Sequence, residues 1–172
     1  MEPTPLPTSG DWRADISTRF WARLVDGVLL GIPSVVLIVL VADFGDVEGG
    51  RLDLPFWAVA ASVLAAALYE IGFIAMSGQT IGKRALKIQV VDVGTGRPPG
   101  LGGATLRYLV PSVPALLPGI GPFLGLLVYL SAVWNPSRQG WHDRSAGTVV
   151  VRTAARQAIT GGWAEPGPEA GP

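Results

Sequence analysis

The sequence has no cysteine and a single histidine, His142, among its 172 residues. The absence of cysteine excludes disulfide bonds and thiol chemistry. Zinc and iron sites depend mostly on cysteine and histidine, so the usual ligand sets for these metals are missing too. We therefore expect neither a metal nor a cofactor. A lone histidine in a polar turn is expected to be exposed and solvated.

Charge is also scarce. Asp, Glu, Lys and Arg make up 15% of the chain, compared with about 25% in an average soluble protein. The 13 basic residues balance the 13 acidic ones, so no net field would attract the chain to nucleic acid. Apolar residues make up 49% of the chain, and the mean hydropathy is +0.41. This composition predicts a small membrane protein with polar ends.

Two long apolar segments are present. The first, from Leu24 to Ala42, contains one charged residue, Asp26, close to its start. The second, from Leu54 to Met76, contains only Glu70. A helix that crosses the bilayer needs about 20 consecutive, predominantly apolar residues. We expect both segments to be transmembrane helices.

The two signs of charge occupy different loops. Residues 43–53, between the apolar segments, carry four acidic residues and one arginine, whereas residues 77–107 are mainly basic. Basic residues near the ends of membrane helices favour the cytoplasmic side. The first helix is therefore expected to start in the cytoplasm and the second to return there. The arginines at both ends of the chain place both termini in the cytoplasm.

The apolar stretch from Leu106 to Trp134 is interrupted by four prolines, with Gly119 and Gly121 between the last two. Proline breaks or kinks a helix because it lacks an amide hydrogen. A single crossing would leave the arginine-rich C-terminal part outside the cell, against the charge rule. We therefore predict two short helices, hinged at residues 118–122, that enter and leave on the same side as third and fourth membrane segments.

Two short segments have the composition of strands. Apolar and polar residues alternate over 86–90, and residues 148–152 are rich in valine. Since a strand outside the membrane must pair, we expect residues 86–93 and 148–152 to form a cytoplasmic two-strand pair. The predicted fold is an all-α integral membrane protein with two transmembrane helices, a Pro/Gly-broken helical hairpin and this strand pair. Disordered tails at 1–15 and 153–172 would flank a membrane domain at 16–152.

Three motifs resemble the RDD family of small bacterial membrane proteins. They are Phe-Trp-Ala-Arg-Leu-Val-Asp-Gly at 20–27, Gly-Gln-Thr-Ile-Gly-Lys-Arg-Ala-Leu-Lys-Ile-Gln-Val-Val-Asp at 78–92 and Gln-Gly-Trp-His-Asp-Arg-Ser-Ala-Gly-Thr-Val-Val at 139–150. The arginine and two aspartates that name the family would be Arg23, Asp26 and Asp143. Trp141 departs from the family, whose members often have an aliphatic residue there. The resemblance implies transport of an unidentified ligand, and some members are similar to sodium/proton antiporters.

Charged side chains near the cytoplasmic ends of the helices form the candidate site. Asp26 should point into the bundle, because a carboxylate facing lipid is disfavoured. Arg23 shares a helix face with Asp26 and could pair with it or reach the headgroups. Glu70 could join Asp26 as a cation or proton site, or bond to Ser34 or a tyrosine. Asp143 could cap a turn or form an ion pair with Arg23, Lys83, Arg84 or Arg107. The predicted cluster comprises Arg23, Asp26, Glu70, Lys83, Arg107 and Asp143.

These observations predict a multi-pass protein of the cytoplasmic membrane that takes part in transport of an ion or small ligand through the cluster. The alternative is a non-transporting scaffold or accessory subunit whose buried charges are structural. No nucleophile with a partner base was found, so an enzyme is not expected. The few helices enclose little space, so we expect a homo-oligomer or a partner membrane subunit.

Overall fold

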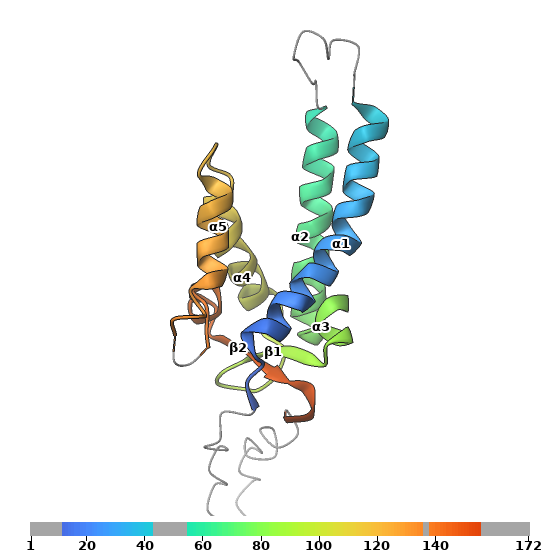
Figure 1. The fold of residues 1–172 in the computed structure, drawn as a ribbon. Coiled ribbons are helices and arrows are strands. Elements are labelled where there is room, and N and C mark those ends of the chain that lie inside the picture. The colour runs from blue at the N-terminus through green and yellow to red at the C-terminus, as the bar shows by residue number, and fades with distance from the viewer. Residues whose placement is uncertain (1–11, 43–54, 136–137, 156–172) are drawn as a thin grey trace, which may run out of the picture.

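The computed structural model describes residues 12–42, 55–135 and 138–155. Two of its helices are long and apolar enough to cross a membrane, α1 (Ile16–Val41) and α2 (Phe56–Ser77). They lie side by side and antiparallel, and form the longer arm of the molecule (Figure 1). The predicted acidic loop at 43–53 lies outside the described residues. Both predicted apolar segments are thus helical.

The surfaces of α1 and α2 are apolar and open to the surroundings. Phe56 is 85% exposed and Leu40 is 77% exposed, and only a small share of either helix is buried by the rest of the chain. A soluble protein rarely exposes so large a contiguous apolar surface. Hydrocarbon is the environment that fits these helices.

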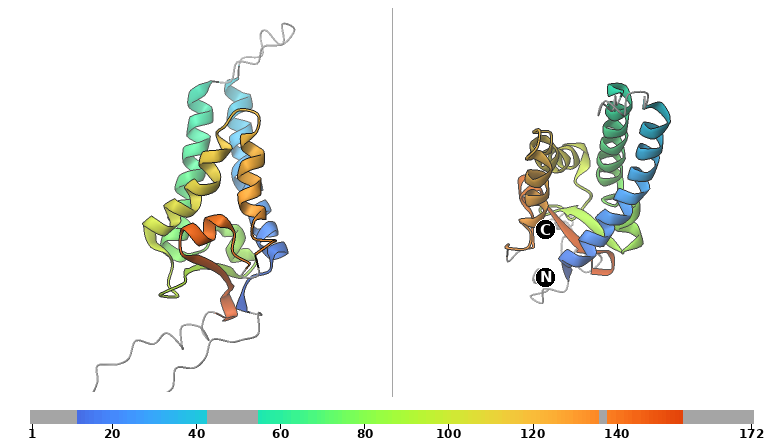
Figure 2. Two further views of the ribbon diagram at one scale, coloured as in Figure 1. Left: turned by 90° about the vertical axis from the view of Figure 1, so that its left-hand side faces the viewer. Right: turned by 45° about the horizontal axis from the view of Figure 1, so that its top comes forward.

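A second, shorter arm is formed by α4 (Gly100–Ala115) and α5 (Gly121–Leu130), which lie side by side (Figures 1 and 2). Helix α4 runs through Pro111 and Pro114, and the chain turns at residues 116–120. The helix starts at Gly100, six residues before the predicted apolar segment. The glycines around residue 100 have low helix propensity, so composition gave no sign of this first turn.

Beneath the arms lies a two-stranded antiparallel sheet of β1 (Ile88–Asp92) and β2 (Thr148–Arg152). Val90 pairs with Val150 at its centre. The predicted strand pair is therefore confirmed. Each strand follows a one-turn helix, α3 (Ile81–Ala85) before β1 and α6 (Trp141–Ser145) before β2.

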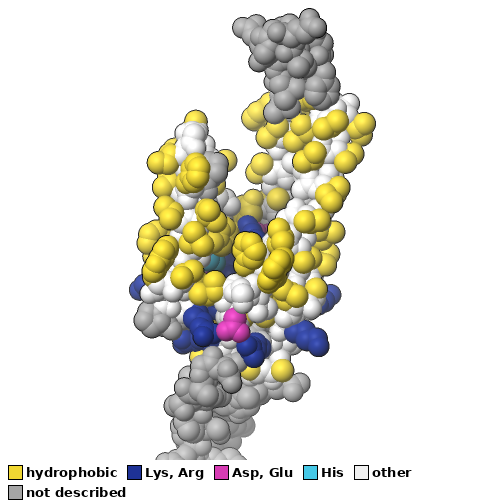
Figure 3. Space-filling model, in the orientation of Figure 1, with side chains coloured by type: hydrophobic (Ala, Val, Ile, Leu, Met, Phe, Trp, Pro, Cys, Tyr) yellow, Lys and Arg dark blue, Asp and Glu magenta, His cyan; other side chains and the backbone are white. Residues whose placement is uncertain are grey.

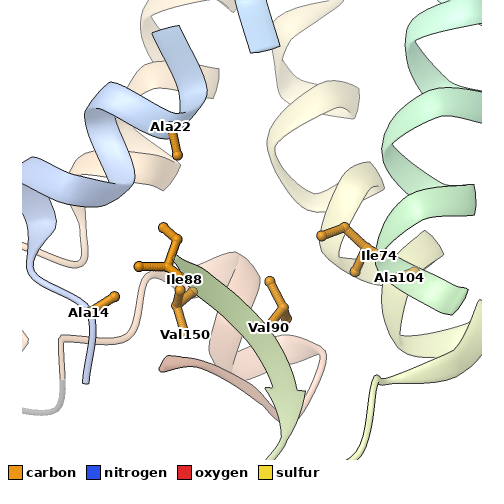
Figure 4. Packing of buried hydrophobic residues seen from close by; sticks show 7 residues of the cluster. All are labelled: Ala14, Ala22, Ile74, Ile88, Val90, Ala104 and Val150. Atoms are coloured by element: carbon orange, nitrogen blue, oxygen red, sulfur yellow. The ribbon is translucent and has the colours of Figure 1, made fainter. Parts of the chain in front are cut away.

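The core joins one face of the sheet to the bases of the helices. Ile88, Val90 and Val150 pack together with residues that include Ala22 of α1 and Ile74 of α2 (Figure 4). The N-terminal segment lies along the edge of β2 and contributes to both faces of the sheet, since Ala14 belongs to the same core cluster. Residues 12–15 were expected to belong to the tail, but Trp12 packs against the other face, Arg13 bridges to Val151 and Ala14 is buried.

The sheet region is built from two equivalent units separated by 60 positions. Gln79 Nε2 donates to the Ile88 carbonyl at 2.9 Å, and Gln139 Nε2 donates to the Thr148 carbonyl at 2.9 Å. The residue before each strand has positive φ, 55° at Lys87 and 61° at Gly147. The strand register is symmetric about the same relation, because residues 90 and 150 face each other. The chain thus repeats one order of elements, namely two helices, a one-turn helix and a strand.

Candidate functional site

Asp26 is buried where α1 meets the start of α3. Its carboxylate accepts hydrogen bonds from Tyr69 Oη at 2.7 Å, Thr80 Oγ1 at 2.5 Å and the Gly82 amide at 2.7 Å. Gly82 must be a glycine at this point, because a Cβ would lie 2.2 Å from the Ala22 carbonyl oxygen. Asp26 points into the bundle as predicted. Its partners, however, are three uncharged donors, so it fastens α3 to the two long helices.

Arg23 joins three helices. Its Nη1 donates to Glu70 Oε1 of α2 at 2.6 Å, and its Nη2 donates to Tyr129 Oη of α5 at 2.6 Å. The guanidinium also lies over the Tyr129 ring, 4.7 Å from its centroid. The predicted pairs of Arg23 with Asp26 and of Glu70 with Ser34 do not form. Ser34 instead donates to the carbonyl of Leu30 in its own helix.

Asp143 is fully buried and holds α6 against α1 and α4. It forms ion pairs with Arg107 and, at 3.3 Å, with Arg19 Nη1. It also accepts from the Gly140 amide at 3.2 Å, so the capping contact and the ion pair weighed for it coexist. Of the arginines that were considered, Arg107 is the partner. Arg23 does not contact Asp143.

Lys83 is the buried cation with the weakest hydrogen bonding and ion pairing. Its side chain is 7% exposed, and its Nζ lies 3.4 Å from Thr80 Oγ1. Lys83 takes part in no ion pair with any residue of the described parts of the chain. Burial lowers the pKa of Lys83 to about 8, although Glu70 opposes this change. A protonated Lys83 is therefore costly here.

His142 is buried, not exposed and solvated as expected from sequence. Its ring lies 4.8 Å from that of Tyr129, and its Nε2 is 3.4 Å from Asp143 Oδ1. Burial, with Arg107 nearby, lowers the pKa of His142 well below its ordinary value. The imidazole is therefore neutral at pH 7 and adds no charge to the cluster.

Two cavities flank the Arg23–Glu70 pair. The lateral cavity, about 230 Å³, lies between α1 and α5, and its polar lining consists of Arg19, Arg23, Glu70, Lys83, Arg107, Tyr129 and His142. The inner cavity, about 250 Å³, is lined mainly by α1, α2 and α4, and its polar lining consists of Arg23, Asp26, Tyr69, Glu70, Thr80, Tyr108 and Ser112. Figure 3 shows Lys or Arg and His side chains deep in the gap between the two apolar arms.

A larger hollow of about 600 Å³ lies at the edge of the sheet, beside Arg84, Lys87 and Arg152. It shares no residue with the buried cluster. Within the described parts of the chain, no three His, Cys, Asp or Glu side chains are grouped to hold a metal ion. The cluster and its two cavities are the stronger site.

Seven polar residues of this site were not predicted from the sequence, namely Arg19, Tyr69, Thr80, Tyr108, Ser112, Tyr129 and His142. Two signals could have found some of them. Arg19 lies one helical turn before Arg23 and so faces the same way. Tyr129 lies 60 positions after Tyr69, the same separation that relates Gln139 to Gln79.

Comparison with known proteins gives relatives but no solved fold. The chain is 28% identical over 164 residues to the proline-rich antigen homologs of two Mycobacterium tuberculosis strains, CDC 1551 / Oshkosh and ATCC 25618 / H37Rv. The match covers 86% of this chain and 65% of each relative, so the chain spans somewhat less than two thirds of their length. No solved structure matches. The model of the RDD family matches residues 13–147. This span includes α1 to α6 and every residue of the cluster, so the chain belongs to the RDD family of small bacterial membrane proteins.

Proposed function

We propose that this protein is a multi-pass protein of the cytoplasmic membrane, with the sheet and both termini on the cytoplasmic side. Helices α1 and α2, of 26 and 22 residues, have lengths of about 39 and 33 Å, enough to cross a hydrocarbon core of about 30 Å. Helices α4 and α5, of 16 and 10 residues, reach only about 24 and 15 Å. The second arm enters the membrane part of the way and returns to the cytoplasmic side.

The charges support this orientation. Arg13, Arg84, Arg138 and Arg144 belong to the sheet end of the molecule or to its connecting turns. Basic residues favour the cytoplasmic side. In this orientation the buried cluster lies near the inner leaflet, where partly inserted helices and a polar cavity can be shielded by protein.

Within this arrangement, the protein takes part in transport of an ion or small ligand through the polar cluster. The observation that carries this proposal is the position of the Arg23–Glu70 pair, which lines both the lateral and the inner cavity. Opening of this pair would join the two spaces. Ionisable groups buried among membrane helices commonly mark ion pathways. The role proposed is not enzymatic.

Exchange of protons for Na⁺ or K⁺ by purified protein in liposomes tests the proposal. Glu70→Gln removes the titrating group while keeping an acceptor for Arg23, and we expect it to abolish exchange in protein that still inserts. Asp15→Asn is the matched control, because Asp15 is exposed and pairs with Arg138 and Arg152 outside the cluster. Unchanged exchange in Glu70→Gln would rule out the pathway through this pair.

The second candidate is a structural subunit that transports nothing. It is favoured by the contacts of Asp26 and Asp143, whose partners tie the one-turn helices to α1 and α4. A scaffold predicts no exchange by wild-type protein in any gradient. It also predicts that Glu70→Gln lowers thermal stability as much as a change at Asp26. In either role, the exposed arms could contact a second copy or another membrane subunit.

A further inference from the structure

The lateral cavity has a surplus of positive charge. Four cationic side chains line it, against one carboxylate, that of Glu70. Asp143, which pairs with Arg19 and Arg107, and Asp26, which lines the inner cavity, add two more carboxylates. With both included there are still four cations for three carboxylates. His142 is neutral, so it does not change this balance. An uncompensated cation in a membrane-embedded site is costly, and such groups are found paired.

Two of these cations, Lys83 and Arg107, have N–H donors that bond to no acceptor in the described parts of the chain. Among the residues that the structure describes, the side chain of Lys83 has only the Thr80 hydroxyl within hydrogen-bonding reach. Arg107 is 7% exposed, and its contacts with Thr148 and Asp143 both use Nη1. Its remaining N–H groups have no hydrogen-bond partner among the described residues. Together with Arg23, whose side chain is 43% exposed, these residues present donors suited to an anion with several oxygen atoms.

The lining of the same cavity also includes apolar side chains from both arms. Phe20 of α1 and Leu126 and Leu130 of α5 line it. Phe20 is 62% exposed and Leu126 is 54% exposed, and the gap between the arms is open toward the viewer in Figure 3. The cavity, at about 230 Å³, is large enough for a phosphate ester but too small for a whole lipid. Hydrocarbon chains attached to such a group would lie outside, along the apolar helices.

We propose that the lateral cavity binds the phosphate of an anionic phospholipid, held by Lys83, Arg107 and Arg23, with the acyl chains against α1 and α5. Charge complementarity selects this occupant, since a basic pocket between membrane helices on the cytoplasmic side suits an anionic headgroup. The bound phosphate offsets the surplus charge and stabilises protonated Lys83. The site goes beyond the proposed function, because it depends on membrane insertion but not on transport.

Native mass spectrometry of the delipidated full chain tests this site with three probes, namely phosphatidylglycerol, phosphatidylcholine and inorganic phosphate. We expect phosphatidylglycerol to bind about tenfold more tightly than phosphatidylcholine, because a hydrogen-bonded charge pair contributes on this scale. Lys83→Gln should weaken phosphatidylglycerol binding about tenfold. Arg84→Gln, which makes the same charge change at the next, exposed position of α3, should leave it within about twofold.

Equal affinity for the two lipids, or equal weakening by both variants, would overturn the site. Displacement of phosphatidylglycerol by millimolar inorganic phosphate would show a free-anion site and overturn the lipid assignment. If Lys83→Gln fails to fold, Lys83→Arg keeps the charge and should retain the preference for phosphatidylglycerol. Loss of the preference for phosphatidylglycerol in folded Lys83→Arg would also contradict the proposal. Ion exchange without lipid selectivity would overturn this inference alone, whereas lipid selectivity without exchange would overturn only the transport function.

Discussion

At the scale of single residues, Asp26 is the carboxylate whose contacts are most fully made, since three donors from α2, the loop after it and α3 converge on it. Replacing it with alanine leaves these donors without an acceptor. We expect Asp26→Ala to lower the free energy of unfolding by about 3 kcal/mol, because each buried donor that loses its partner costs about 1 to 3 kcal/mol. Thermal unfolding in detergent measures this change.

Asp15→Ala is the control for that measurement. Asp15 pairs with Arg138 at 2.5 Å and with Arg152 at 2.6 Å, and all three side chains are well exposed. Exposed ion pairs contribute about 0 to 1 kcal/mol, so this variant should change stability by less than that. Equal losses in the two variants would contradict the structural role assigned to Asp26.

Lys83 should make stability depend on pH above neutrality. Its pKa is about 8 in the folded protein, below the ordinary 10.5. Between these values the unfolded chain binds more protons than the folded one, so stability rises with pH in this window. From pH 7.5 to 9.5 the gain is about 2 kcal/mol. Thermal unfolding of lipid-free protein at both pH values gives the difference.

The same pH series on Lys83→Met is the control. Groups other than Lys83 titrate in both proteins, so their contributions cancel in the difference between the two. The variant should gain about 2 kcal/mol less than wild type over this pH range. A rise of equal size in both proteins would show that Lys83 is not the group responsible.

The members of the predicted cluster could be identified from the sequence, but their hydrogen-bond and ion-pair partners could not. Arg23 and Asp26 lie three positions apart, which leaves about 60° between them around a helix. This angle is enough for Asp26 to face α3 while Arg23 faces Glu70 and Tyr129. The burial of His142 depends on α5 packing over α6, and no local pattern encodes that contact.

At the scale of elements, the two units of the repeat use the same hydrogen bond to lock a one-turn helix to its strand. Gln79→Ala and Gln139→Ala each remove an amide donor from a strand carbonyl. A typical hydrogen bond contributes about 1 kcal/mol, so each variant should lose about that much stability. Thermal unfolding of both variants tests the equivalence, and a clear loss in only one of them would contradict it.

The two units differ at the residue that precedes each strand. Lys87 adopts φ 55°, a conformation that Gly147 adopts freely at φ 61°. Left-handed backbone costs a non-glycine residue about 1 to 2 kcal/mol, partly offset by the flexibility of glycine in the unfolded chain. Lys87→Gly should therefore stabilise the protein by up to about 1 kcal/mol. Gly147→Lys should destabilise it by a similar amount, and a stabilising effect of this reverse change would contradict the argument.

The strand pair could be predicted from alternation and valine content, but the repeat could not. Over residues 79–92 and 139–152 only four of fourteen positions are identical, namely the glutamines, the arginines and two pairs of valines. Lys83 and Asp143 even carry opposite charges at equivalent positions. The repeat is preserved in backbone geometry and burial, which the side-chain identities alone do not reveal.

At the scale of the whole molecule, the long apolar segments were sufficient to predict the long arm, and charge segregation was sufficient to predict an orientation for it. The membrane depth of the second arm depends on the orientation proposed above. The absence of cysteine from the chain makes that orientation directly measurable. Single cysteines can be introduced into an otherwise unchanged protein and tested with a thiol reagent that does not cross membranes.

Two positions give the sharpest comparison. Glu48 lies between the two long helices in the sequence, and Thr95 lies in the turn after β1. A third cysteine at Ala155, just after β2, reports on the return of the second arm. All three variants would be labelled first in intact cells and then after permeabilisation.

The labelling pattern of these three variants tests the central claim, that both arms start and end at a cytoplasmic sheet which holds the buried charges. The account predicts that Glu48→Cys reacts in intact cells, while Thr95→Cys and Ala155→Cys react only after permeabilisation. Labelling of Ala155→Cys from outside, with Thr95→Cys still protected, would place the two strands on opposite sides of the membrane and contradict the account.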